Sequence, residues 1–123
     1  MATEKQCSDT LQRIEADMPG FIAASVVDLD SGMTLAAVSR RTDFDLTVAS
    51  AYNSEMVKQK LKIMSVLKLD MPLEDMLLTL GEQIHLIKIV SPTTFIYVAS
   101  ERANSNLAIV RSVVTREAKQ LTD

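Results

Sequence analysis

The sequence predicts an α+β sandwich, in which a five-stranded antiparallel sheet carries helices on both of its faces. Three observations support this prediction. Three segments repeat apolar residues at helical spacing, five short apolar runs have the length of strands, and turns containing glycine or proline separate neighbouring strands. The expected element order is α-β-β-α-β-β-β-α. With 123 residues, the chain suits a single domain spanning residues 1–123.

The composition argues against several classes of function. A net charge of −3 lacks the basic excess of a nucleic-acid-binding surface. The first ten residues lack the apolar run of an export signal, and no apolar run approaches the ~20 residues of a membrane span. The single cysteine, Cys7, cannot form an internal disulfide. We therefore expect a cytoplasmic protein that neither binds nucleic acid nor inserts into membranes.

The N-terminal half is predicted from apolar spacing and turn residues. Cys7, Leu11, Ile14 and Met18 form an amphipathic helical stripe, and the continuous apolar run after it suits a strand covered on both faces. The predicted elements are a helix ended by Pro19-Gly20, a strand over Phe21 to Asp28, a turn over Asp28 to Gly32, a returning strand over Met33 to Val38, and a long helix over Asp43 to Leu67 that Thr42 or Asp43 caps.

The C-terminal half reads as three short strands and a last helix, after a loop around Pro72. The strands are expected over Asp75 to Leu80, Gln83 to Val90 and Thr94 to Ala99. Ser100 to Asn104 are expected to open the helix, whose buried stripe is Ala103, Leu107, Val110, Val114, Ala118 and Leu121.

The long helix carries two ridges, and one neighbouring sheet does not account for both. Ridge one spans about 100° of arc and is predicted to cover the sheet. It comprises Val48, Ala49, Tyr52, Met56, Ile63, Val66 and Leu67. Ridge two has the spacing of a helix-to-helix seam. It comprises Leu46, Ser50, Asn53, Val57, Leu61 and Met64. A helix that packs on its own sheet and also carries a seam needs a partner.

Two polar motifs are interpreted as structural. Asp28-x-Asp30-x-Gly32 resembles the start of a calcium loop, but no further carboxylate follows in Met33 to Ala37, which favours a turn. Arg40-Arg41 can offer an arginine to a phosphate, but a solvated link is the favoured interpretation.

Catalytic groups are scarce. His85 has no obvious acid or nucleophile beside it, so a structural or partner-facing histidine is favoured, and a pH-sensitive contact stays open. Cys7 lies on the apolar stripe of the first helix and is expected to be a buried hydrophobe. One cysteine and one histidine give no metal-ligand cluster, and no glycine-rich phosphate loop is present. We therefore expect no metal, no cofactor and no enzymatic activity.

The order of elements and several local strings resemble the roadblock family of dynein light chains, in its bacterial form, from about Leu11 to Leu121. The strongest stretch is Gly20 to Asp28 followed by Asp30-Ser31-Gly32 and Leu35-Ala36, which is similar to the family's glycine, apolar strand, aspartate-and-glycine turn and second strand. Further similarity lies in Ala49 and Ala51, in Leu77 to Leu80, in Gln83 to Ile87, and in Asn106-Leu107-Ala108.

The resemblance implies a profilin-like fold that forms a homodimer. In the family, the strand after the long helix pairs with its copy, and the two long helices pack side by side. The edge is then Met76, Leu77, Leu78, Thr79 and Leu80, and the helix seam is ridge two: Leu46, Ser50, Asn53, Val57, Leu61 and Met64. An apolar edge strand left unpaired would be prone to aggregation, which fits this implication.

The resemblance also implies a role as a partner of a Ras-like small GTPase, with Glu55, Lys58 and Lys62 of the long helix in contact with it. The leading hypothesis is a non-enzymatic homodimer that binds and regulates such a GTPase, as an activator of hydrolysis or as a scaffold. The alternatives are a scaffold subunit of a motor or signalling complex without effect on nucleotide turnover, or a small-ligand sensor. The sequence names neither the partner nor the source organism, and it leaves homodimer and heterodimer open.

Overall fold

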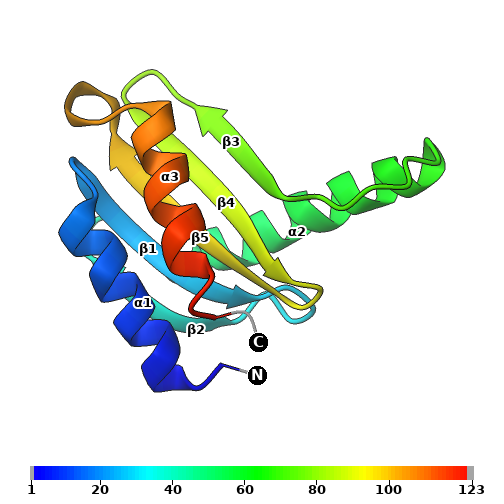
Figure 1. Ribbon diagram of the computed structural model, residues 1–123, viewed down its shortest axis with the longest axis horizontal. Helices are drawn as coiled ribbons and strands as arrows, with labels where there is room; N and C mark the ends of the chain where they lie inside the picture. The colour runs from blue at the N-terminus through cyan, green and yellow to red at the C-terminus, as the bar shows by residue number, and fades with distance from the viewer. Residues whose placement is uncertain (1, 122–123) are drawn as a thin grey trace.

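In the computed structural model, which describes residues 2–121, five antiparallel strands form one sheet in the order β2-β1-β5-β4-β3 (Figure 1). The element order and the antiparallel sheet confirm the predicted fold class. The elements are α1 Glu4–Asp17, β1 Phe21–Asp28, β2 Thr34–Ser39, α2 Leu46–Val66, β3 Asp75–Thr79, β4 Gln83–Ser91, β5 Thr94–Glu101, the 3₁₀ helix η1 Arg102–Asn104 and α3 Leu107–Ala118.

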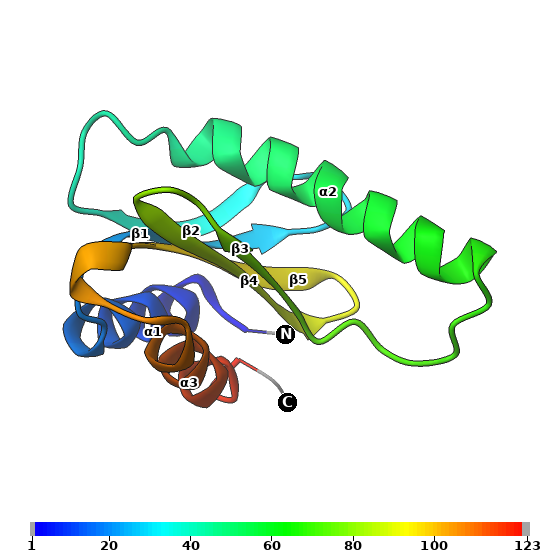
Figure 2. The same ribbon diagram turned by 90° about the horizontal axis from the view of Figure 1, so that it is seen from above.

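Three layers make up the molecule, with α1 and α3 on one face of the sheet and α2 on the other (Figure 2). The central strands β1 and β5 are buried on both faces, as the unbroken apolar run of Phe21–Asp28 predicts. Each face has its own core: Leu11, Ile14 and Val114 belong to the first, and Val57 and Phe95 to the second.

The helix ends follow capping chemistry, which shifts several predicted boundaries. Thr3 and Gln6 form a reciprocal capping box, so α1 begins before its apolar stripe. At the start of α2, the cap is Asp45 and not Thr42 or Asp43, because the Asp45 carboxylate accepts from the Val48 N–H at 3.1 Å.

The last helix begins later than predicted. β5 continues to Glu101, and η1 separates it from α3. Asn106 caps α3 by accepting from the Ile109 N–H at 2.9 Å, which fixes the start at Leu107. Ala103 is therefore exposed in η1 and does not belong to the buried stripe of α3.

The two ridges of α2 take the opposite roles to those predicted. Val57 is fully buried and Leu46, Ser50 and Met64 are buried as well, so most of ridge two packs within the chain. Ridge one was predicted to cover the sheet, yet Tyr52 is 73% exposed and Val66 71%. The physical reason is that the small Ser50 of ridge two and the neighbouring Ser54, both buried, let the helix approach the strands closely.

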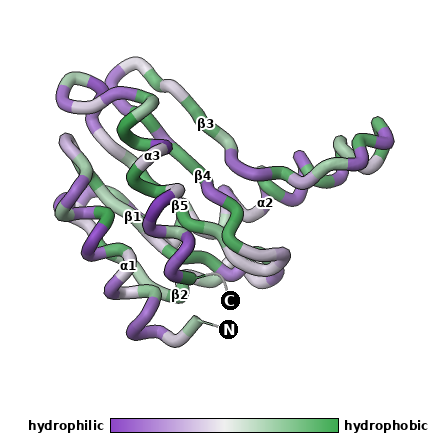
Figure 3. Tube along the Cα trace, in the orientation of Figure 1, coloured by the Kyte–Doolittle hydropathy of each residue, from purple (hydrophilic) through white to green (hydrophobic). Residues whose placement is uncertain are grey.

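The C-terminal half of α2 extends beyond the sheet, and the following loop returns from its tip to β3 (Figures 1 and 2). Apolar residues continue to this tip, as the hydropathy colouring shows (Figure 3). Leu67 and Met71 are each 61% exposed there. The projecting half of α2 thus presents apolar surface with no sheet of its own beneath it.

Candidate protein-interaction surface

The edge strand β3 presents free backbone groups in a regular array. Its ladder with β4 has no register shift, and two flanking bonds set the alternation: Ile89 N–H to Glu74 C=O at 3.0 Å and Leu80 N–H to Gln83 C=O at 2.8 Å. The backbone groups of Asp75, Leu77 and Thr79 therefore point away from β4. Among residues 2–121 no strand lies beyond β3, so these groups face an open edge.

The predicted edge residues lie on β3 or directly after it. Met76 packs against the core beneath α2, and Leu77 packs against the core beneath α1 and α3. Leu78 lies opposite His85 in register. The structure places Met76, Leu77, Leu78 and Thr79 on the strand and Leu80 at its exit.

The exposed sides of α2 differ in chemistry. Ala49 and Met56 pack against the core above β4 and β5, and Tyr52, Ile63 and Leu67 follow them at helical spacing. We call these five residues the apolar flank; it lies toward β3. Contacts with the β1–β2 turn mark the opposite side, where Gly32 lies beside Ala51 and Ser54. That side carries Glu55, Lys58 and Lys62, which we call the charged flank.

Of the three predicted partner contacts, Lys58 has intramolecular partners. Its Nζ donates to the Asp30 C=O at 3.0 Å and lies 3.9 Å from Glu55. Glu55 and Lys62 are exposed, so their side chains are accessible to another protein. Within the charged flank, Lys58 therefore holds the β1–β2 turn against α2, whereas Glu55 and Lys62 remain accessible.

The predicted seam residues lie mostly inside the chain. Leu46, Ser50, Val57 and Met64 are buried within the chain, so they offer little surface to a second copy, and a seam through them stays a prediction. Asn53 is partly buried, and Leu61 is 39% exposed. Sequence reasoning missed Leu69 and Met71, exposed apolar residues of the loop after α2, although two large apolar residues in a loop were a usable signal.

His85 lies in a cluster that the sequence did not reveal. Its Nε2 is 2.7 Å from Gln83 Oε1, and its Nδ1 is 3.1 Å from the Tyr97 hydroxyl. Burial lowers the pKa of His85 and raises the pKa of Tyr97 to about 12. The structural interpretation of the histidine thus fits its surroundings.

Other candidate groups are engaged in structural contacts. Asp28 accepts from both the N–H and the hydroxyl of Ser31, so the segment is a turn, and these bonds lower the pKa of Asp28. Arg40 donates to Glu15 at 2.9 Å, and Arg41 donates twice to Asp43. Within residues 2–121 no group of three or more metal-ligating side chains is placed to hold an ion.

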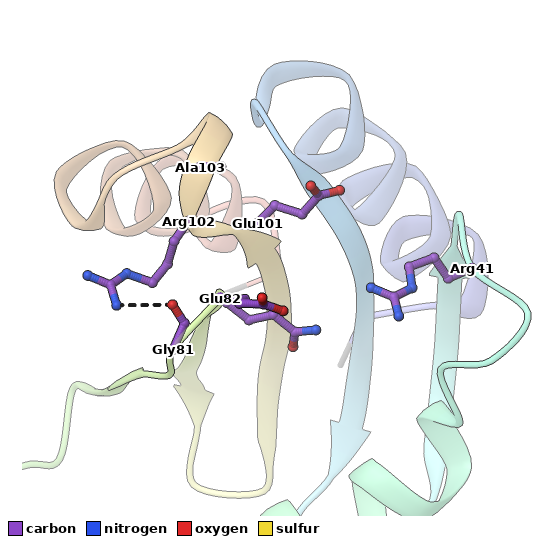
Figure 4. A pocket seen from close by; sticks show the side chains of 7 residues that line it. Arg41, Gly81, Glu82, Glu101, Arg102 and Ala103 are labelled. Carbon is purple, nitrogen blue, oxygen red and sulfur yellow. Dashed lines mark hydrogen bonds between the residues drawn. The ribbon is translucent and has the colours of Figure 1, made fainter.

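A cavity of about 680 Å³ opens at the end of the sheet where β5 meets η1 (Figure 4). Arg41, Glu82, Glu101 and Arg102 line it, and Arg102 donates to the backbone carbonyls of Leu80 and Gly81. The cavity is open to solvent, and its wall carries both positive and negative side chains.

None of the helices in the described part of the chain has both the length and the apolar character needed to cross a membrane.

No protein-family model matches the chain, and no curated protein matches its sequence. Solved structures share its fold. Myxococcus xanthus MglB superposes with a TM-score of 0.88 at 13% identity, covering 99% of this chain and 89% of that one. The gliding protein MglB of Thermus thermophilus superposes with a TM-score of 0.82 at 11% identity, covering 98% of this chain and 89% of that one. A Roadblock/LC7 domain from Streptomyces avermitilis superposes with a TM-score of 0.77 at 13% identity, covering 98% of this chain and 95% of that one. The chain therefore has the Roadblock/LC7 fold, as its resemblance to the roadblock family predicts.

Proposed function

We propose that this chain is a non-enzymatic interaction module that forms a homodimer through β3 and α2. We further propose that the dimer binds and regulates a Ras-like small GTPase in the cytoplasm. One observation carries the proposal: the open edge of β3 and the apolar flank of α2 lie on the same side of the molecule. A second copy related by a two-fold axis satisfies both surfaces together.

Pairing of β3 with its copy supplies hydrogen-bond partners for the outward groups of Asp75, Leu77 and Thr79. The projecting half of α2 then reaches over the partner's sheet, where its exposed apolar side chains become buried. Full burial of one such large side chain contributes about 1.5–3 kcal/mol. The apolar flank replaces ridge two as the proposed helix seam.

A cavity of about 470 Å³ beneath the projecting half of α2 supports the same assembly. Met64, Leu69, Met71 and Leu73 give it an apolar wall, and the first residue of β3, Asp75, closes one side. Asp75 therefore belongs both to the lining of this cavity and to the open edge of β3. A second copy that pairs along this edge is therefore placed to fill it.

The proposed GTPase role is supported by the resemblance to the roadblock family, whose members serve as partners of small GTPases. The structural neighbours include MglB proteins, one of them described as a gliding protein and another in a tetrameric arrangement. Glu55 and Lys62 on the charged flank stay exposed when the apolar flank is covered, so a dimer still offers them to a third protein. Mixed charges of this kind favour specific recognition and faster association.

The test is a GTP-hydrolysis assay with Ras-like GTPases from the same genome, with and without the chain. We expect one of them to bind the dimer and change its hydrolysis rate. The combined variant Glu55→Lys and Lys62→Glu keeps the net charge and should weaken the effect. Lys5→Glu together with Asp9→Lys, a charge swap on the opposite face of the molecule that also keeps the net charge, serves as the matched control and should leave the effect unchanged.

Three outcomes separate the hypotheses. Binding without a change in hydrolysis favours a scaffold subunit over a regulator. If no GTPase binds, the regulatory proposal is wrong.

The ligand-sensor alternative rests on a cavity of about 690 Å³ between the chain ends and the β4–β5 turn, lined by Leu35, Val90 and Leu121. A thermal shift with a metabolite and no protein partner would favour it.

A further inference from the structure

Both faces of the sheet hold polar groups among apolar ones. On the side of α1 and α3, Leu11 and Val114 are fully buried, and Thr10 and Glu117 are buried as well. On the side of α2, Ser50 Oγ lies 2.7 Å from Thr34 Oγ1, and the buried Ser25 Oγ has no partner among the described residues. Helix α2 therefore depends on hydrogen bonds for part of its attachment, and such attachments are sensitive to a change in protonation.

A series of polar contacts links α2 to β4 through β5. The Asn53 side chain of α2 interacts with the Tyr97 hydroxyl of β5 and lowers its pKa, and that hydroxyl lies 3.1 Å from His85 Nδ1 on β4. His85 Nε2 in turn lies 2.7 Å from Gln83 Oε1. Because an amide oxygen accepts and cannot donate, Nε2 carries the ring proton and Nδ1 accepts from Tyr97. The series is complete when the imidazole is neutral.

The surroundings of the ring are apolar or uncharged. Phe44 lies edge-on to His85 with ring centroids 6.2 Å apart, and Leu78 of β3 lies opposite it in register. The charged groups at that end of the face are Glu82, Arg102, Glu101, which lies opposite Gln83, and the Arg41–Asp43 ion pair. Gln83 itself lines the solvent-open cavity of Figure 4, which gives a proton a short route to the cluster.

We propose that His85 makes the attachment of α2 to the sheet sensitive to protons. A protonated ring bears a hydrogen on Nδ1 and can no longer accept from the Tyr97 hydroxyl. The Nδ1–H instead points at the Tyr97 oxygen and competes there with the Asn53 side chain, so the hydroxyl must reorient and the link to α2 weakens. A positive charge is also placed in a cluster without a carboxylate partner, which disfavours the closed arrangement.

The direction of the pH effect follows from burial, which favours the neutral ring in the folded chain. In the unfolded chain His85 is protonated as the pH falls below the ordinary histidine pKa of about 6.5. In the folded chain its pKa is lower, so the ring stays neutral over part of that range. The attachment of α2 is therefore complete above about pH 6.5 and weakens as the pH falls toward the lowered pKa of the folded chain. This inference concerns one chain and does not depend on the proposed GTPase.

The test combines proton titration with hydrogen exchange. The chain has a single histidine, so in untagged protein one imidazole signal reports His85 by NMR. Amide protection factors of α2 are measured at about pH 7.5 and about pH 5.5, on either side of the ordinary pKa. We expect a several-fold loss of protection in α2 over the range in which His85 titrates, and unchanged protection in α1.

Two variants and a control decide the outcome. His85→Gln retains hydrogen-bonding capacity without a titrating ring, so α2 should stay protected at both pH values. Tyr97→Phe removes the linking hydroxyl, so α2 protection should no longer follow the titration. Ser65→Ala removes an exposed hydroxyl from the same helix, outside the apolar flank, and should behave as the unmodified chain. Constant α2 protection in the unmodified chain, or an equal loss in His85→Gln, would overturn the inference.

Discussion

The two edges of the sheet differ in the regularity of their strand pairing and in the side chains of α2 that lie beside them. The β2 edge has a register shift at Val26/Val27, a β-bulge of the kind that twists an edge away from further pairing. The β3 edge has five residue pairs without a shift. Apolar side chains of α2 lie beside β3, whereas the charged flank lies toward β2. An edge that is regular and flanked by apolar surface is suited to pairing, and an edge with a bulge and charged neighbours is not.

The largest expected effect comes from a proline at the β3 edge. Thr79→Pro removes an N–H that points away from β4, so the chain keeps its own ladder while cross-chain pairing loses a bond and gains a clash. We expect the dimer to be lost at micromolar concentration, measured by analytical ultracentrifugation.

Ala37→Pro is the matched control on the other edge. Arg40 N–H bonds the Ile22 C=O at 2.9 Å, which places the Ala37 N–H on the outer side of β2. This variant should stay dimeric. If both prolines dissociate the dimer, or neither does, the difference between the two edges has no bearing on assembly.

A charge on the apolar flank should have the next largest effect. Tyr52→Glu together with Ile63→Glu places four carboxylates in a two-fold interface, and we expect the dimer to weaken by at least about 100-fold, or about 2.7 kcal/mol. Thr47→Glu, on the side of α2 away from β3, should change the dissociation constant little. Equal weakening by both variants would rule out the apolar flank as the seam.

Val57→Ala tests the corrected position of ridge two. Val57 is fully buried against the sheet, so the truncation leaves a cavity and should lower the free energy of unfolding by about 2 kcal/mol. Chemical denaturation measures this change. The dimer dissociation constant, measured under native conditions, should move far less; a large rise in it would return Val57 to the seam.

The smallest effect concerns the tie between β3 and α3. Arg111 donates two hydrogen bonds to Asp75, at 3.0 and 2.9 Å, across a partly exposed surface. Arg111→Met keeps the aliphatic stem and should cost about 1 kcal/mol of unfolding free energy. A large loss of the dimer without loss of stability would show that the ion pair positions the edge.

The fold was predictable because its signals are local. The apolar run of Phe21–Asp28, the turn at Gly32 and the spacing of Val110 and Val114 each depend on neighbours in sequence. The two ridges of α2 were assigned the wrong way round because both are apolar at helical spacing. Which ridge faces the sheet depends on side-chain size: Ser50 and Ser54 allow close approach, whereas Tyr52 does not. That comparison requires the strands to be in place.

The interaction surface was predictable only in part. The edge strand over Asp75–Thr79 followed from the order of elements together with the resemblance. The cluster of Asn53, Tyr97 and His85 was not predictable, because its members come from three elements and meet only when the sheet register is known. Lys58 was predicted to contact a partner protein, and its bond to the Asp30 backbone carbonyl was not predictable, because a backbone acceptor carries no sequence signal.

The mass of the chain in solution tests the central claim most directly. Light scattering at micromolar concentration should give twice the 13.6 kDa of one chain, because the β3 edge and the apolar flank are then paired with a second copy. A mass of 13.6 kDa at that concentration would contradict the account, since both surfaces would be exposed to water without a partner.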